Sequence, residues 1–198
     1  MGNTIKEVIK NKIYGIVRAD DTKRAIEIAS AYLEAGLKVI EMNTNFEAIK
    51  EISTDREISV AAGGIITGIQ ANKAVEAGAK ILVSPILQMG LVKSCSWYKI
   101  PLILTATTPN EAYTAWKARI PLIKIYPIKD LGGVTYMEDM LRQMSFLNLM
   151  PSGSVSVKDI KNYLSHGASA VALGRELYKD KTYKEIVEIT KLAIEEAK

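Results

Sequence analysis

The chain has 198 residues, of which 48% are hydrophobic and 24% are charged, a balance typical of one folded domain with a sizeable core. No apolar run approaches the roughly 20 residues that a membrane-spanning helix needs, and we expect no signal peptide in "MGNTIKEVIKNK" because it lacks an apolar segment. The single cysteine, Cys95, excludes an internal disulfide, so a reducing cytoplasm is the simplest location.

The net charge is +4 at pH 7, from 26 basic and 22 acidic residues. The lysines are spread along helical segments and are not gathered into a basic stretch with interleaved aromatic residues, as nucleic-acid-binding surfaces often are. We therefore expect no nucleic-acid partner and no membrane partner.

The only histidine, His166, excludes zinc sites built on several imidazoles, and the single cysteine excludes those built on thiolates. His166 precedes a glycine in "YLSHGASAV", which is typical of a helix C-terminus. Catalysis by a Ser-His-Asp or Cys-His arrangement would depend on this one residue. We therefore expect chemistry carried by carboxylates, lysine, tyrosine or the backbone, with no metal and no other cofactor.

Short apolar segments alternate with amphipathic helical patterns along the chain. Residues 4–12 are predicted to form a helix, and Thr108 to Glu111 reads as a capping box that opens a later one, as do Ser156 and Asp159. Eight strands are predicted at residues 13–17, 38–42, 58–62, 80–84, 101–105, 122–126, 148–152 and 170–174.

One phrase recurs at the junctions of these elements: a helix ends in Ala-Gly or Gly-Ala, and a short apolar strand follows. It occurs in "EAGLKVIEM", "EAGAKILVSP" and "HGASAVALG". The glycines, Gly36, Gly78 and Gly167, recur at multiples of roughly 21 to 22 residues. A left-handed glycine at the end of a helix explains the phrase locally.

Eight strand–helix units in one domain predict a closed, parallel (β/α)₈ TIM barrel, an α/β fold, over residues 1–198, with an extra N-terminal helix. An open, doubly wound sheet is the alternative. No G-x-G-x-x-G follows the first strand, which disfavours a dinucleotide-binding fold.

Lys124 lies in the middle of the apolar segment "IPLIKIYPI", where an ammonium ion without a partner would cost several kcal/mol. Glu41 ends the second predicted strand, and Lys124 lies on the sixth. Because a barrel layer draws its side chains from alternate strands, both can point into the same interior layer. An amine facing a carboxyl suits imine chemistry on a ketone. A buried ion pair without a catalytic role, or a lysine that points outward under a helix, explains the pattern equally well.

Six segments, "GIVRADD", "KVIEMNTN", "VAAGGIITGIQANKAVEAGAKILVSP", "IKIYPI", "LMPSGSVSVKDIKNYL" and "AVALGREL", resemble in order and spacing the 2-keto-3-deoxy-6-phosphogluconate (KDPG) and 4-hydroxy-2-oxoglutarate aldolase family. The resemblance runs from about residue 10 to the end of the chain. It implies a class I aldolase, a carbon–carbon lyase, in which Lys124 forms the Schiff base and Glu41 is the general acid and base. It also implies small-molecule partners, namely 2-oxo acid and aldehyde substrates that carry a phosphate in some members, and a homotrimer.

The resemblance also implies substrate-binding residues at the strand ends and in the loops after them. Arg18 matches an arginine that holds an anionic group, and the loops after strands seven and eight match a phosphate site. The implied binding residues are Arg18, Asn45, Gly64, Ser84, Thr105, Ser152, Gly153, Ser154, Gly174 and Arg175.

The chain departs from the family pattern around the substrate. It has Ala61-Ala62-Gly63-Gly64 for the usual Gly-Ala-Gly-Thr, and Asn45 where many members have an arginine for the pyruvate carboxylate. Leu104-Thr105 replaces Pro-Gly, and Ser152-Gly153-Ser154 replaces Thr-Gly-Gly. One lost hydrogen bond to a charged group is worth about 1.5–3 kcal/mol, so the substrate is expected to differ more than the reaction.

Other interpretations stay open for the sequence. The chain could be an isomerase or epimerase that uses Lys124 and Glu41 as acid and base, or a phosphate-binding barrel without catalytic activity. Tyr126, two residues after the lysine, is expected to pack in the barrel mouth or to assist proton transfer. Trp97 and Trp116 are expected to be packing or interface residues.

Overall fold

The computed structural model describes residues 3–55 and 58–198 and contains one eight-stranded sheet in which every strand pair is parallel. The strands are β1 (Ile13–Val17), β2 (Val39–Met42), β3 (Ser59–Ala62), β4 (Ile81–Ser84), β5 (Leu102–Ala106), β6 (Ile123–Ile125), β7 (Leu149–Pro151) and β8 (Val171–Leu173).

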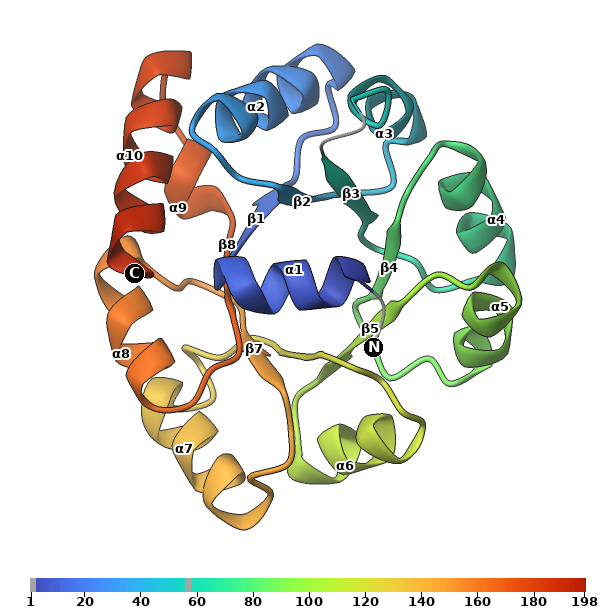
Figure 1. Cartoon of the computed structure of the whole chain (residues 1–198), viewed down its shortest axis with the longest axis vertical. Coiled ribbons are helices and arrows are strands. Elements are labelled where there is room, and N and C mark those ends of the chain that lie inside the picture. Colours follow the sequence, from blue (N-terminus) through green and yellow to red (C-terminus); the bar gives the residue numbers. More distant parts are fainter. Residues whose placement is uncertain (1–2, 56–57) are drawn as a thin grey trace.

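Helices surround the strands as an outer ring, except for the first helix, which lies across one end of the barrel (Figure 1). They are α1 (Asn3–Asn11), α2 (Thr22–Glu34), α3 (Phe46–Ile52), α4 (Gly68–Glu76), α5 (Gly90–Tyr98), α6 (Pro109–Lys117), α7 (Gly133–Gln143), α8 (Ile160–Ser165), α9 (Arg175–Tyr178) and α10 (Tyr183–Glu196), with one 3₁₀ turn, η1 (Val157–Asp159), before α8. None of the helices in the described part of the chain is long and apolar enough to cross a membrane.

The sheet curls into a nearly closed barrel. Its strand order is β7-β6-β5-β4-β3-β2-β1-β8, so β1 pairs with both β2 and β8. Between β7 and β8 the Ser169 amide donates a hydrogen bond to the Leu149 carbonyl at 2.8 Å. The predicted (β/α)₈ barrel is therefore confirmed, and the open, doubly wound alternative is wrong.

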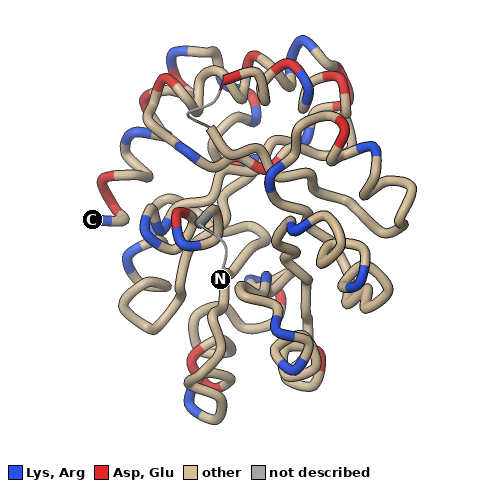
Figure 2. Tube along the Cα trace, turned by 45° about the vertical axis from the view of Figure 1, so that its right-hand side comes forward, with Lys and Arg blue, Asp and Glu red and all other residues tan. Residues whose placement is uncertain are grey.

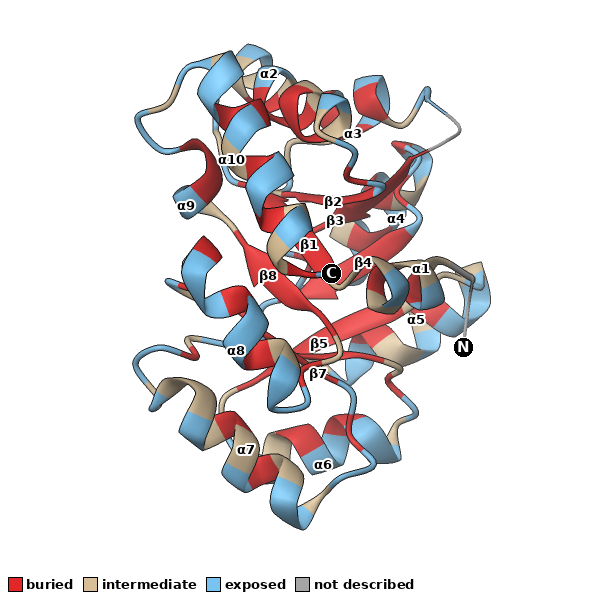
Figure 3. Cartoon of the chain, turned by 60° about the vertical axis from the view of Figure 1, so that its left-hand side comes forward, coloured by how far each residue is buried: buried red, intermediate tan, exposed pale blue. Residues whose placement is uncertain are grey.

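Two apolar cores lie on opposite sides of the strands, because successive side chains of a strand point to opposite faces. The outer core packs the helices against the barrel, and Figure 3 shows buried strands flanked by helices that are buried on one side only. The inner core fills the barrel with Tyr14, Ile16, Val39, Ala61, Ile81, Val83, Ile103, Leu122, Met150, Ala170 and Ala172.

Helix α1 completes the inner core at the end where the strands begin. It lies across the middle of the ring of strands (Figure 1) and ends two residues before β1. Ile5 and Val8 are fully buried and belong to the inner core. The Ser59 hydroxyl, at the start of β3, donates a hydrogen bond to the Glu7 carboxylate at 3.4 Å. The predicted N-terminal helix is thus a plug for one end of the barrel.

The predicted helix ends are confirmed in detail. Capping boxes are present at Thr108 and at Ser156. The recurring glycines all have positive φ, +104° at Gly36, +95° at Gly78 and +96° at Gly167, which is the backbone region that glycine enters without steric cost. His166 caps the C-terminus of α8.

The last three strands are shorter than predicted. Strands β6, β7 and β8 contain three residues each, whereas the apolar patterns predicted five. An apolar run marks burial, whereas the ends of a strand are set by the regular pairing of its backbone, which hydrophobicity does not report. Tyr126 therefore lies just beyond β6.

We predict that Ile5→Ala lowers the free energy of unfolding by about 2–5 kcal/mol, because it leaves a cavity in a fully buried part of the inner core. The exposed neighbour on the same helix provides the control, Lys6→Ala, which should change stability by no more than about 0.5 kcal/mol. Urea unfolding followed by circular dichroism measures both variants. Equal stability of the two variants would mean that α1 is not part of the cooperative core.

Candidate active site

Lys124 and Glu41 meet inside the barrel. Lys124 is the middle residue of β6, and its neighbours Ile123 and Ile125 belong to the outer core, so its side chain lies on the inner face with that of Leu122. The Lys124 Nζ lies 2.5 Å from the Glu41 Oε2. The lysine is 5% exposed and the glutamate 3%. The alternative in which the lysine points outward is therefore wrong.

This ion pair lies in a largely apolar interior. A buried pair costs desolvation energy on both ions, and apolar replacements of the two together are often neutral or stabilising. Removing only one partner costs about 3–5 kcal/mol, since the other charge is left uncompensated. The arrangement gives an amine and a carboxyl that can exchange a proton directly, in a place from which bulk water is excluded.

Tyr14 lies against this pair, a residue that the sequence reasoning missed. The Lys124 Nζ is 5.6 Å from the centre of its ring, and the side chain is fully buried. Burial and the nearby Glu41 carboxylate raise the pKa of Tyr14 well above its ordinary value. Alternation along β1, which turns Tyr14 and Ile16 inward, is the signal that could have found it.

Gly63, directly after β3, makes room for the Glu41 side chain. A methyl group on its Cα would come within 2.5 Å of the Glu41 Oε1 and 3.0 Å of its carboxyl carbon. Any larger residue would therefore displace the carboxylate from its present position. The sequence reasoning also missed this role, although Gly63 follows a strand that pairs with β2, with Ala61 opposite Glu41.

Thr105 lies in the interior next to Lys124, and Ser84 does not. Thr105 pairs with Lys124 in the β5–β6 register, and its hydroxyl donates a 2.7 Å hydrogen bond to the Ser84 carbonyl. By alternation along β4 the Ser84 side chain shares the outer side of Leu82, where it is fully buried. The structure thus does not bring the Ser84 hydroxyl to the amine.

Asn45 and Gly64 lie in the loops after β2 and β3. The Asn45 side chain accepts a hydrogen bond from the Ala48 amide at the start of α3 and donates one to the Thr22 hydroxyl, each at 3.1 Å. Its polar atoms therefore hold the loop and the helix end together. Gly64 is exposed with φ +79°, beside the Thr44 side chain.

The remaining predicted binding residues share one cavity of about 600 Å³ at the ends of β1, β6, β7 and β8. We call it the distal cavity; its predicted members are Arg18, Ser152, Gly153, Ser154, Gly174 and Arg175. Sequence reasoning missed three further cations that line it, Lys129, Lys179 and Lys181, together with the acidic Asp130 and Glu176.

The Ser152–Ser154 loop owes its shape to close packing with Tyr126. Gly153 has φ +103°, and a Cβ there would meet the Tyr126 ring at 3.0 Å and the Pro127 backbone at 3.0 Å. Tyr126 is 42% exposed and lines the distal cavity. The prediction that it packs in the barrel mouth is therefore confirmed.

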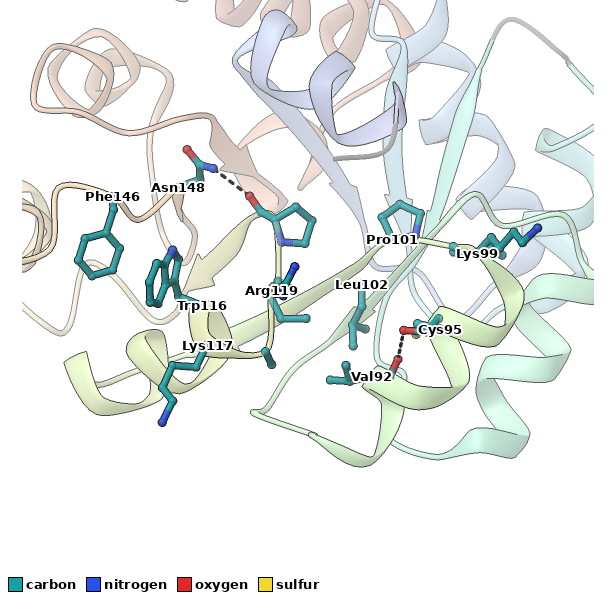
Figure 4. A pocket seen from close by; sticks show the side chains of 15 residues that line it. Val92, Cys95, Lys99, Pro101, Leu102, Trp116, Lys117, Arg119, Phe146 and Asn148 are labelled. Atoms are coloured by element: carbon teal, nitrogen blue, oxygen red, sulfur yellow. Dashed lines mark hydrogen bonds between the residues drawn. The ribbon is translucent and has the colours of Figure 1, made fainter.

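A larger cavity, of about 950 Å³, lies at the other end of the strands and shares no residue with the site above. Figure 4 shows Trp116, Phe146 and Arg119 along it, with Pro101 just before β5. Pro121, just before β6, also lines it. Trp116 packs on the Phe146 ring, with centres 4.4 Å apart, as the sequence analysis expected of a packing residue.

The cysteine at this second cavity is not poised for reaction. Burial raises the pKa of the Cys95 thiol to about 11, so the thiol stays protonated at neutral pH, and the nucleophilic thiolate is scarce. Basic and acidic residues are interspersed over the described part of the chain (Figure 2). The amine–carboxyl pair inside the barrel is therefore the candidate catalytic group.

Solved structures support the fold. The structure of the KDPG aldolase of Zymomonas mobilis ZM4 with 3-phosphoglycerate superposes with a TM-score of 0.87 at 23% identity, covering 96% of this chain and 94% of that one. A KDPG aldolase from Legionella pneumophila, with pyruvate captured at low pH as a covalent carbinolamine intermediate, gives a TM-score of 0.81 at 20% identity, covering 96% and 94%.

Sequence comparisons identify the family. The chain is 25% identical over 169 residues to the 2-dehydro-3-deoxy-phosphogluconate aldolase of Treponema pallidum, covering 82% of this chain and 80% of that protein. It is 28% identical over 148 residues to the KHG/KDPG aldolase of Escherichia coli K12, covering 72% and 70%. The family model "KDPG and KHG aldolase" matches residues 5–192. The chain therefore belongs to the KDPG and KHG aldolase family of carbon–carbon lyases.

Proposed function

We propose that the chain is a class I aldolase that cleaves or forms a pyruvate-derived 2-oxo acid such as KDPG or 4-hydroxy-2-oxoglutarate. Lys124 forms the imine, and Glu41 is the general acid and base. The observation that carries the proposal is the 2.5 Å contact between the Lys124 Nζ and the Glu41 Oε2 in the barrel interior. The similar proteins from Treponema pallidum and Escherichia coli are KDPG or KHG aldolases, which supports the same reaction for this chain.

Imine formation needs both members of the pair. Glu41 takes a proton from the Lys124 ammonium, and the free amine adds to the C2 carbonyl of the 2-oxo acid to give a carbinolamine. Glu41 then returns the proton to the carbinolamine hydroxyl, which leaves as water, and an iminium ion remains. The carbinolamine captured in the Legionella pneumophila enzyme supports this sequence of steps.

Bond cleavage uses the iminium as an electron acceptor. Glu41 removes the proton of the C4 hydroxyl, the C3–C4 bond breaks, and its electron pair moves toward the nitrogen to leave an enamine and an aldehyde. The protonated Glu41 then protonates C3 of the enamine. Addition of water to the resulting iminium releases pyruvate and restores the amine.

The distal cavity would hold an anionic group at the far end of the substrate. Arg18 and Arg175 line it together with Lys129, Lys179 and Lys181. Charge-assisted hydrogen bonds from such groups are roughly twice as strong as neutral ones. The charge balance of this cavity supports a phosphate or carboxylate on the aldehyde fragment, held by these residues and by Ser152 and Ser154.

The homotrimer that the resemblance implies stays a prediction. Apolar side chains in the loops after β3 and β4 and at the start of the helices that follow are exposed, namely Ile66, Ile69, Ile86 and Met89. Such a surface favours contact with another copy of the chain.

We predict that borohydride added with pyruvate labels the peptide that contains Lys124, as read by mass spectrometry. Lys124→Met, which keeps most of the side-chain volume, should abolish labelling and lower cleavage on the order of 10⁴-fold or more. Lys117→Met, on the outside of α6, is the matched control and should label as the wild type does. An isomerase, an epimerase or a non-catalytic barrel would give no labelled Lys124 with any 2-oxo acid.

We predict that Glu41→Gln lowers turnover by about 10²–10⁴-fold, because the amide keeps the shape of the side chain but cannot accept or return a proton. Stopped-flow measurement of pyruvate release, with circular dichroism as a test of folding, measures the effect. Glu138→Gln, on the exposed face of α7, is the control. Turnover equal to that of the wild type in Glu41→Gln would remove this residue from the mechanism.

We predict that Arg175→Met raises KM about tenfold for a phosphorylated 2-oxo acid and leaves kcat within about twofold, because it removes a charge-assisted contact far from the reacting carbon. The same variant should keep the wild-type KM for pyruvate in the methyl-proton exchange reaction. Lys161→Met, on α8 outside the cavity, is the control. The same loss for both substrates would contradict an anion site at Arg175.

A further inference from the structure

The Tyr14 hydroxyl is a buried polar group without a hydrogen-bond partner in the described part of the resting structure. Its side chain is fully buried, and its hydroxyl has no partner at the distance and angle of an ordinary hydrogen bond among the described residues. The great majority of buried side-chain polar atoms have a partner, so an orphan hydroxyl in a native core calls for an explanation.

The surroundings of Tyr14 differ from those of the other fully buried tyrosine. Tyr32, in the outer core, donates a hydrogen bond from its hydroxyl to the Ile16 carbonyl at 3.5 Å. Tyr14 instead lies in the inner core beside the ion pair, with its ring 5.6 Å from the Lys124 Nζ. Burial, the charge of the Glu41 carboxylate and the approach of the Tyr14 hydroxyl to that carboxylate together raise the pKa of Tyr14. Glu41 is therefore an acceptor close to this hydroxyl, and in the resting structure one of its oxygens, Oε2, is bound to the lysine.

Imine formation changes the hydrogen bonds that Lys124 can donate to the Glu41 carboxylate. The Lys124 ammonium has three N–H donors, and the iminium that replaces it has one, fixed in the plane of the imine. Glu41 therefore loses donors at the stage when its carboxylate must be aimed at a substrate proton. The Tyr14 hydroxyl, a neighbouring donor without a described partner in the resting state, could then donate to the Glu41 carboxylate.

We propose that Tyr14 is a positioning residue, whose hydroxyl donates a hydrogen bond to the Glu41 carboxylate once Lys124 has become an imine. This inference rests on the proposed aldolase function and adds a third residue to it. Tyr14 keeps its proton throughout the cycle. Its hydroxyl only gains a hydrogen bond to the Glu41 carboxylate. The proton that moves between substrate and protein stays on Glu41, as before.

The test separates imine formation from proton abstraction. Labelling with pyruvate and borohydride measures the imine, and exchange of the pyruvate methyl protons in D₂O, followed by NMR, also requires Glu41 to remove a proton from C3. Tyr14→Phe removes only the hydroxyl. We expect the extent of labelling to stay within about twofold and the exchange rate at saturating pyruvate to fall about tenfold or more. Tyr32→Phe is the matched control and should change neither.

Two further measurements distinguish a positioning role from a structural one. The Tm of Tyr14→Phe should equal or exceed that of the wild type, because the lost hydroxyl has no partner in the resting protein. The acidic limb of kcat against pH should move to higher pH, because a carboxylate that loses a donor is protonated more readily.

The failing outcomes are distinct. No labelling of the wild type would overturn the proposed function and this inference with it. Labelling of the wild type together with unchanged exchange in Tyr14→Phe would overturn the inference alone. So would an equal loss of labelling and exchange, or a Tm below that of Tyr32→Phe.

Discussion

The ion pair between Lys124 and Glu41 is the constraint on which the barrel interior depends. Two opposite charges lie 2.5 Å apart in a space that is otherwise filled with aliphatic and aromatic side chains. Each ion satisfies the other, so neither can be replaced alone without a large cost in stability. The same closeness lets one proton pass between amine and carboxyl, which is what imine chemistry requires. Gly63 belongs to this arrangement as well, because the absence of a side chain there leaves room for the carboxylate.

The residues proposed to react and those proposed to recognise the substrate come from different parts of the fold. The ion pair is carried by strands β2 and β6, whose ladder hydrogen bonds fix the backbone on both sides. The distal cavity is lined largely by loops and by the short helix α9. Loops accept substitutions more easily than strands. A changed set of substrate contacts beside an unchanged amine and carboxyl is therefore the expected way for such a barrel to acquire a different substrate.

Much of this arrangement could be predicted from the sequence because it follows from periodicity. Alternation along a strand and the layering of even-numbered strands allowed Lys124 and Glu41 to meet inside the barrel, but left open a lysine that points outward. The same rule also gives Ser84 the outer side of β4, because a side chain one position along a strand lies on the opposite face. Alternation along β1 would also have turned Tyr14 inward, but its contact with the ion pair, like that of Gly63 with Glu41, joins residues far apart in the chain, which no local pattern encodes. The ends of the last strands depend on individual backbone hydrogen bonds, which a hydrophobicity pattern does not report.

The position of α1 affects the order in which the two products of the proposed reaction leave the barrel. The helix seals the end of the barrel at which the strands begin, with Ile5 and Val8 in the inner core. In the proposed reaction, substrate and products would therefore reach the amine from the opposite end of the barrel, where the distal cavity lies. In the proposed reaction the three-carbon fragment is tethered to Lys124 at the bottom of this dead-end passage, and the aldehyde fragment lies above it. Release is then sequential, with the aldehyde departing first and the tethered fragment last.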